Sequence, residues 1–303
     1  MNIASLDLGS NTFLLTIAEL SNHSFKILHD ECVVTRLAQG VDATGSLHAD
    51  ALARAEQCFQ GFAQTLKKYD AKRISAMATS AARDAKNGEE FIALGKKYNI
   101  PIEIISGERE ARLTFLGGTY QLPAMHQPVV VDVGGGSTEY IVQANQKQLF
   151  AQSLDIGSVR LTEKFITENP IARQEQDAVR EYIVQQLERL PSEMSSYVST
   201  MVAVAGTPTT LACLMEEREF DITTMHGKHI LLSDLRRWLD KLAGMSVEQR
   251  LELTGMQPGR ADVIVCGLCI LEQSLDFFKM DQLTVSCTGV RYGLLQEMAN
   301  ESS

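Results

Sequence analysis

The sequence has no excess of basic residues and no apolar run long enough to span a membrane. Asp and Glu (38) outnumber Lys and Arg (28), and the formal net charge is −10. This balance argues against a nucleic-acid-binding protein, because phosphate backbones select basic surfaces. It does not exclude an anionic substrate, provided that the binding cleft is locally basic or holds a metal ion. We therefore expect neither a nucleic-acid partner nor a membrane.

The sequence also lacks paired cysteines and any sign of a secretory leader. Its six cysteines are scattered, and an apolar strand pattern follows directly after Met1 and Asn2, so we expect a reduced, cytoplasmic protein. Cys266 and Cys269 form a C-x-x-C, but they lie in the apolar segment 263–271. No second ligand pair accompanies them, so we interpret both as buried hydrophobes and not as a redox or zinc site.

What the chain does contain is a glycine-rich turn in residues 129–139, which read V-V-V-D-V-G-G-G-S-T-E. The β-branched run predicts a buried strand, Asp132 lies where that strand ends, and a second apolar run follows the glycines. Such a turn lets a ligand approach the main chain, and its successive N–H groups form an anion site suited to phosphate. The alternative is an ordinary glycine-rich hairpin. The candidate phosphate-binding residues are Gly134, Gly135, Gly136, Ser137 and Thr138.

A second copy of this pattern opens the chain. Residues 3–12 read I-A-S-L-D-L-G-S-N-T, with Asp7 at the end of the apolar strand and a new strand from residue 13. Two such units suggest a duplicated domain in which both turns bind one polyphosphate. A carboxylate beside each anion site implies a cation between them, and Mg²⁺ fits best. The phosphate-binding candidates of this copy are Gly9, Ser10, Asn11 and Thr12.

The order of the remaining elements predicts two α/β domains. A helix over 49–69 has apolar residues on one stripe, and residues 24–37 read as a further pair of strands. Pro123 and Pro128 flank a polar connection, so we place one domain at 1–121 and the other at 122–288. The final helix, 289–303, has no obvious partner in its own half, and we expect it to pack back onto the first domain.

The two turn motifs resemble the phosphate loops of the exopolyphosphatase / guanosine pentaphosphate phosphohydrolase family, in its short two-domain form. That family belongs to the actin, sugar-kinase and heat-shock-chaperone superfamily. The resemblance implies an α/β fold of two duplicated ribonuclease H-like (actin-like ATPase) domains with an inter-domain cleft. Further segments look like family landmarks, in family order: residues 79–88, 105–113, 153–157, 206–207, 226–227 and 260–262.

The resemblance also implies a reaction, the hydrolysis of the terminal phosphate of inorganic polyphosphate or of guanosine pentaphosphate. Mg²⁺, or another divalent cation, would be held near Asp7, Asp132 and Glu139. Glu110 is the candidate that orients or deprotonates the attacking water, and Glu139 is a second candidate acid. The alternatives are that Glu110 only stabilises a helix N-terminus and that Glu139 is an exposed strand residue.

Four further residues are candidates for binding phosphate. Arg83 could bind a phosphate bidentately, although a surface ion pair with a neighbouring acid is the alternative. Gly206 and Thr207 open a helix after a strand, where anions bind readily, and Arg260 begins a long helix that could reach a substrate phosphate. His226, before a glycine, is interpreted as a turn residue.

The closing motif departs from the family pattern. It usually reads G-x-R-E-G, whereas residues 289–293 here read G-V-R-Y-G, so Tyr292 replaces an acid. Two other functions stay open from the sequence: a small-molecule kinase of the same superfamily, and a non-catalytic sensor of guanosine polyphosphate. A homodimer also stays open.

Overall fold

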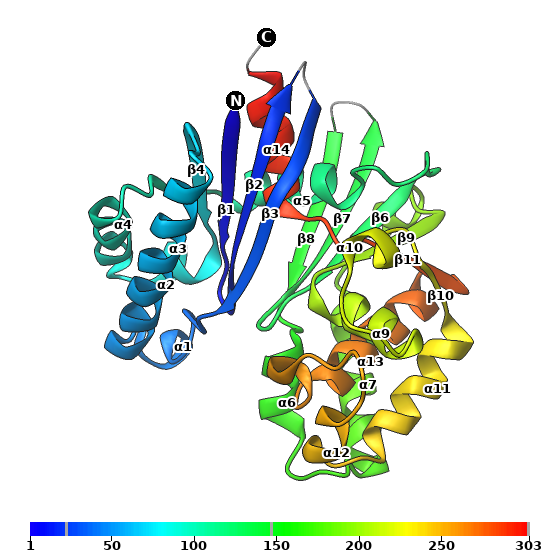
Figure 1. Cartoon of the computed structure of the whole chain (residues 1–303). Coiled ribbons are helices and arrows are strands. Elements are labelled where there is room, and N and C mark those ends of the chain that lie inside the picture. The colour runs from blue at the N-terminus through cyan, green and yellow to red at the C-terminus, as the bar shows by residue number, and fades with distance from the viewer. Residues whose placement is uncertain (22–23, 146–147, 302–303) are drawn as a thin grey trace. The chain divides into compact units, whose positions relative to one another are not determined.

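The computed structural model describes residues 1–21, 24–145 and 148–301 (Figure 1). The chain forms two compact units. Unit 1 comprises Met1–Gly117 and Val290–Ser303, and unit 2 comprises Gly118–Gly289. In the described part of the chain, no helix combines the length and the apolar character that crossing a membrane requires.

Unit 1 is built on a mixed sheet of strand order β3-β2-β1-β4-β5. Strand β1 pairs with β2 antiparallel and with β4 parallel, β2 pairs with β3 antiparallel, and β4 pairs with β5 parallel. The strands are β1 (Asn2–Leu8), β2 (Thr12–Ser21), β3 (Ser24–Val34), β4 (Arg73–Ala78) and β5 (Ile102–Ile104). The helices are α1 (Val41–Thr44), α2 (Ala49–Lys68), α3 (Ser80–Asp84), α4 (Gly88–Lys97), α5 (Gly107–Gly118) and α14 (Val290–Asn300).

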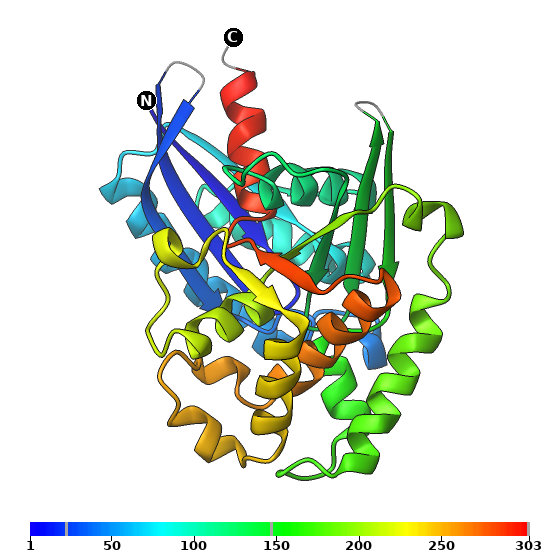
Figure 2. The same ribbon diagram turned by 90° about the vertical axis from the view of Figure 1, so that its right-hand side faces the viewer.

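Side chains of β1 alternate between the two helical layers that cover this sheet. Leu6 and Leu8 join a core cluster with the aromatic residues of α2, such as Phe59, whereas Ile3 packs with the apolar residues of α5 and α14. Because successive residues of a strand point to opposite faces, Asp7 lies on the same face as Ile3. Figure 2 shows α14 alongside β1 and β2, which it contacts.

Unit 2 has the strand order β10-β11-β9-β6-β7-β8. The strands are β6 (Pro128–Val133), β7 (Thr138–Asn145), β8 (Gln148–Leu154), β9 (Thr200–Val204), β10 (His229–Leu231) and β11 (Gln282–Val285). The helices are α6 (Ser158–Phe165), α7 (Arg173–Leu187), α8 (Ser192–Ser195), α9 (Gly206–Met215), α10 (Ile222–Met225), α11 (Leu232–Ala243), α12 (Val247–Leu251) and α13 (Ile264–Phe277), with the 3₁₀ turn η1 (Pro258–Arg260).

The two units repeat one topology. The order β8-β7-β6-β9-β11 reproduces β3-β2-β1-β4-β5, with the same parallel and antiparallel pairings. Asp7 and Asp132 are each the next-to-last residue of the first strand of their repeat. The predicted fold class, two duplicated ribonuclease H-like units of the actin-like ATPase type, is confirmed.

Helix α2 and strand β3 cover two segments whose local structure the sequence predicts. The helix predicted over 49–69 is α2, whose buried stripe includes Phe59 and Phe62. Burial of each ring stabilises the fold by about 1.5–3 kcal/mol. The strand pair predicted over 24–37 is wrong, because β3 is one continuous strand that pairs with β2 along its whole length. The short edge strand β10 was not predicted, since three residues carry too little periodicity.

Candidate functional site

The turn after β1, residues 9–11, is termed the Gly9 turn. The carbonyl oxygens of Ser10 and Asn11 accept hydrogen bonds of 2.9–3.0 Å from backbone N–H groups of residues 35–38. In a trans peptide the C=O and N–H groups point in opposite directions, so the N–H of Asn11 points away from that segment. Within the described residues, the N–H groups of Ser10 and Asn11 donate to no protein acceptor. The turn is thus held on its carbonyl side and can bind an anion on its N–H side.

The turn after β6, residues 134–137, is termed the Gly134 turn, and it is held in the same way. Its first two carbonyl oxygens accept backbone hydrogen bonds of 2.9–3.0 Å from the start of α6, and Arg160 Nε donates to the Gly136 carbonyl at 2.7 Å. The N–H groups of Gly135, Gly136 and Ser137 point the other way, and in the described part of the chain they donate to no protein acceptor. The turn that the sequence predicts to bind phosphate thus has three successive N–H groups that could receive an anion.

The Gly134 turn and α6 can approach this closely only because residue 157 is glycine. A Cβ added to Gly157 would lie 2.2 Å from the carbonyl oxygen of Gly135. The N-terminal N–H groups of α6 are consequently satisfied by the turn. The start of α6 therefore fixes the position of the Gly134 turn, and the N–H groups of the turn face away from the helix.

Asp7 lies beside the Gly9 turn on the face covered by α5 and α14. Burial raises the pKa of its carboxyl to about 6, while the positive charge of Arg291 acts in the opposite direction. Arg291, at the start of α14, is 8% exposed and donates to Asp30 at 2.9 Å. Asp30 also accepts a hydrogen bond from the buried Thr16 at 2.9 Å. The sequence analysis did not identify Arg291, although it lies in the closing motif that was noted.

Asp132 and Glu139 are directly opposite each other on the antiparallel pair β6 and β7. Opposite residues share a face of the sheet, with Cβ atoms about 5 Å apart. The hydroxyls of Ser137 and Ser153 both donate to Glu139 Oε1 at 2.7 Å. These bonds orient the carboxylate next to the Gly134 turn, and Ser153 is a partner that the sequence analysis did not assign.

Arg83 and Glu110 are in contact, 3.3 Å apart. Arg83 follows β4 in α3, and Glu110 follows β5 in the first turn of α5. Because β1, β4 and β5 are parallel, their carboxyl ends lie at one edge of the sheet, the usual place for a ligand in such folds. Ser10 Oγ lies 2.9 Å from Ser80 Oγ at the start of α3, which joins the Gly9 turn to this pair. The ion pair considered as an alternative also exists, since Arg83 Nε lies 3.8 Å from an Asp84 carboxylate oxygen.

In unit 2, Gly206 and Arg260 are also brought together. A Cβ on Gly206 would lie 2.0 Å from the Arg260 guanidinium carbon, so a larger residue here would displace the end of the Arg260 side chain. Thr207 is only 1% exposed and its side chain lies against Gly267 of α13, so this predicted phosphate-binding residue is covered within unit 2. Ala205 has φ 72° and ψ −165°, a conformation that is otherwise adopted by glycine and costs about 1–3 kcal/mol.

Known proteins share both this fold and this sequence pattern. A sequence model described as the Ppx/GppA phosphatase family matches residues 16–302. Exopolyphosphatase 2 of Mycobacterium tuberculosis is 35% identical over 317 residues, covering 98% of each chain. The chain belongs to the Ppx/GppA phosphatase family. The crystal structure of the Aquifex aeolicus Ppx/GppA family member has a TM-score of 0.86 at 31% identity, covering 100% of this chain and 99% of that one. The crystal structure of an exopolyphosphatase from Cytophaga hutchinsonii has a TM-score of 0.89 at 27% identity, covering 99% of this chain and 98% of that one.

The acidic residues of this Ppx/GppA protein do not form a complete metal cage. Among the described residues there is no group of three or more His, Cys, Asp and Glu side chains that could hold an ion. Mg²⁺ usually binds through one or two carboxylates together with waters and substrate phosphates, so a complete cage is not required. The Asp7 carboxyl of unit 1, whose pKa is raised, and the Asp132 and Glu139 carboxylates of unit 2, which lie opposite each other, are oxygen donors of the type this ion prefers.

Other residues noted in the sequence have structural surroundings. Tyr292, which replaces the usual acid of the Ppx/GppA closing motif, is 2% exposed and its ring lies 6.4 Å from that of Phe25. His226 donates to the Tyr120 carbonyl and accepts from the Cys287 N–H, so it is fixed as a neutral turn residue.

The two cysteines of the C-x-x-C segment are buried in α13, as predicted. Burial raises the pKa of the Cys266 thiol to about 11 and that of Cys269 further. Thiols with raised pKa values are poor nucleophiles and poor metal ligands at neutral pH.

Proposed function

We propose that this protein hydrolyses the terminal phosphoanhydride bond of inorganic polyphosphate. Guanosine pentaphosphate, which ends in the same type of bond, is the second candidate substrate. Membership of the Ppx/GppA phosphatase family and the similarity to proteins named exopolyphosphatase support the proposal. The observation that carries it is the contact of Arg83 with Glu110 at the strand edge where the Gly9 turn also lies.

Binding of the polyanion would use main-chain N–H groups. Both the Gly9 turn and the Gly134 turn present N–H groups that have no protein acceptor in the described part of the chain. These donors are fixed before the substrate arrives, because their carbonyl sides are already hydrogen-bonded, so little reorganisation is needed on binding. Arg83 in unit 1 and Arg260 in unit 2 would add positive charge, and a guanidinium suits phosphate oxygens.

Asp7 in unit 1, and Asp132 with Glu139 in unit 2, are the residues that would hold Mg²⁺. When bound, Mg²⁺ supplies charge neutralisation for the phosphate oxygens during the transfer. Burial of the Asp7 carboxyl, which raises its pKa to about 6, disfavours an uncompensated negative charge, so a cation bound there would stabilise the ionised form.

Glu110 would take the proton of the water that attacks the terminal phosphorus. Arg83 Nη1 donates both to Glu110 Oε2 and to the carbonyl of Ile105, which directs the carboxylate. Glu139 is less suited to this role, because one of its oxygens already accepts from Ser137 and Ser153. We assign Glu139 to orienting the Gly134 turn and binding the ion.

The test is phosphate release from polyphosphates of several lengths, guanosine pentaphosphate and ATP, without and with acceptor molecules. Hydrolysis without an acceptor distinguishes a phosphatase from a kinase, and absence of turnover on all substrates supports a sensor. Glu110→Gln should lower kcat by about 10²–10⁴-fold, the usual contribution of a general base, while substrate affinity stays close to wild type. Glu108→Gln is the matched control, since Glu108 is an exposed acid in the same helical turn. If Glu110→Gln keeps wild-type turnover and Glu139→Gln has none, the water-activating role belongs to Glu139.

A further inference from the structure

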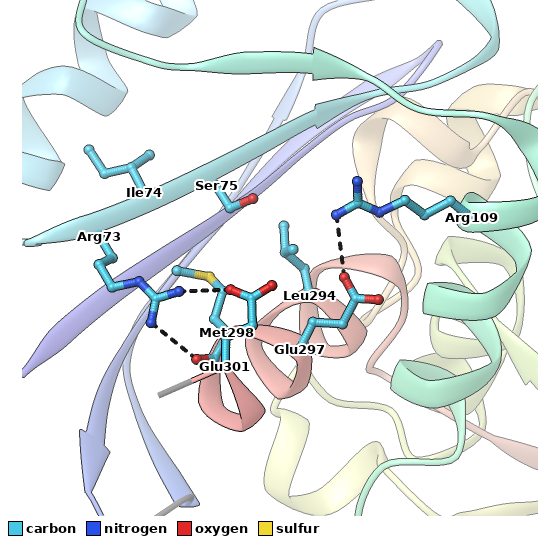
Figure 3. Close-up of a pocket in the computed structure, with 8 residues that line it drawn as sticks. All are labelled: Arg73, Ile74, Ser75, Arg109, Leu294, Glu297, Met298 and Glu301. Carbon is cyan, nitrogen blue, oxygen red and sulfur yellow. Dashed lines mark hydrogen bonds and ion pairs between the residues drawn. The ribbon is translucent and has the colours of Figure 1, made fainter. Parts of the chain in front are cut away.

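A small polar pocket of about 270 Å³ in unit 1 is lined by residues of β4, α5 and α14 (Figure 3). Arg73, at the start of β4, donates to the Met298 carbonyl at 3.2 Å and to Glu301 at 3.0 Å. Arg109 of α5 pairs with Glu297 at 3.4 Å. Both arginines are therefore paired with glutamates near the end of the chain, and the pocket has little net charge with which to attract an anion. Its side chains instead join α14 to β4 and to α5.

Arg109 is adjacent in sequence to Glu110 and contacts two other elements. Its guanidinium lies 2.7 Å from Glu103 on β5 and 3.4 Å from Glu297 on α14. The helical turn that carries Glu110 begins at Gly107, where an added Cβ would meet nothing within 4 Å. Gly107 is exposed, and the bonds of Arg109 are well placed to hold this end of the helix.

Helix α14 packs closely against α5. A Cβ on Gly293 would lie 2.1 Å from the carbonyl oxygen of Leu113, so the two helices are in direct backbone contact. The Gln296 side chain also donates to the Leu116 carbonyl at 3.1 Å. Because the backbones are in contact, the two helices cannot slide freely past each other here. The ion pair between Arg109 and Glu297 therefore holds the start of α5 at a fixed place against α14.

We propose that Arg109 is a positioning residue for Glu110, acting by fixing the first turn of α5 against β5 and α14. The inference rests on the proposed function of Glu110. Partly exposed ion pairs of this kind contribute little to stability. A displacement of about 1 Å in a reacting group, however, can cost on the order of 100-fold in rate.

The test compares Arg109→Met with Arg73→Met. Each variant removes an arginine that binds α14, but only Arg109 also lies in α5. We expect Arg109→Met to lower kcat by about 10-fold or more with little change in KM or melting temperature, Arg109→Lys to recover part of the loss, and Arg73→Met to retain wild-type kcat. Equal kcat values for the two methionine variants would overturn the inference.

A double variant separates this inference from the proposed function. If Arg109 acts through Glu110, Arg109→Met should cause no further loss of kcat in a Glu110→Gln background. An equal fold-loss in both backgrounds would overturn the positioning role and leave the function of Glu110 intact. Wild-type kcat in the Glu110→Gln single variant would refute the proposed role of Glu110, and the inference with it.

Discussion

Gly157→Ala tests whether the Gly134 turn owes its shape to α6. The added Cβ would lie 2.2 Å from the Gly135 carbonyl oxygen and 2.4 Å from the Gly136 carbonyl carbon. Real Cβ atoms essentially never come within 3.0 Å of another group, so the turn or the helix must move by about 0.8 Å. The atoms in the way are main chain and cannot rotate aside, so the displacement acts directly on the N–H groups of the turn.

We expect the substitution to lower kcat/KM as well as the stability of the fold. Backbone shifts from an inserted methyl group typically cost about 1–3 kcal/mol of stability, and the backbone hydrogen bonds from α6 to the Gly134 turn would be stretched. Because a misplacement near 1 Å can cost on the order of 100-fold, kcat/KM for polyphosphate should fall by about 10- to 100-fold. Steady-state phosphate release and urea unfolding measure the two effects separately.

Gly244→Ala is the matched control in the same unit. A Cβ at Gly244, after α11, would lie at an ordinary 3.6 Å from its nearest neighbours, the carbonyl oxygens of Asp240 and Lys241. This variant should keep wild-type kcat/KM. If Gly157→Ala also keeps wild-type kcat/KM and stability, the close approach of α6 does not control the shape of the Gly134 turn.

Two further predictions concern the metal and a buried histidine. Asp7→Asn should raise the Mg²⁺ concentration for half-maximal activity by about 10-fold or more; wild-type activity that is unchanged by EDTA would contradict the metal assignment. Burial lowers the pKa of His226 below its usual 6.5. Between the lowered pKa and 6.5, His226 therefore binds a proton in the unfolded chain but stays neutral in the folded one. The free energy of unfolding should therefore be highest above pH 6.5 and fall as pH drops through the lowered pKa. In His226→Gln that part of the slope should vanish in urea unfolding between pH 8 and 5, and equal slopes in both proteins would exclude this cause.

Much of the candidate site could be predicted because its signals are local. Each turn is a run of apolar residues, an aspartate at the strand end and glycines, and these lie within about ten residues of one another. Periodicity and turn chemistry suffice to interpret such a pattern. The contact between Arg83 and Glu110 joins positions 27 apart in sequence, and both residues were named only because the surrounding segments resemble a known family.

The missed features all depend on distant parts of the chain. Arg291 reaches Asp30 across 261 positions, and neither residue stands in a pattern that points to the other. Ala205 adopts a glycine-like backbone conformation, which its side chain gives no reason to expect. The predicted strand pair at 24–37 failed because a long partner, β2, was available to extend β3 as a single strand, and strand preferences depend on such neighbours.

The sequence by itself determined the two glycine-containing turns, the duplicated α/β order and the carboxylates at the strand ends, since each follows from residues that are close along the chain. Only the tertiary structure decided what holds those groups in place: α6 against the Gly134 turn through Gly157, and α14 against α5 through Gly293. Both contacts depend on the absence of a single Cβ where two backbones meet. A glycine in the sequence shows that such an approach is allowed, but the fold alone shows which backbone makes it.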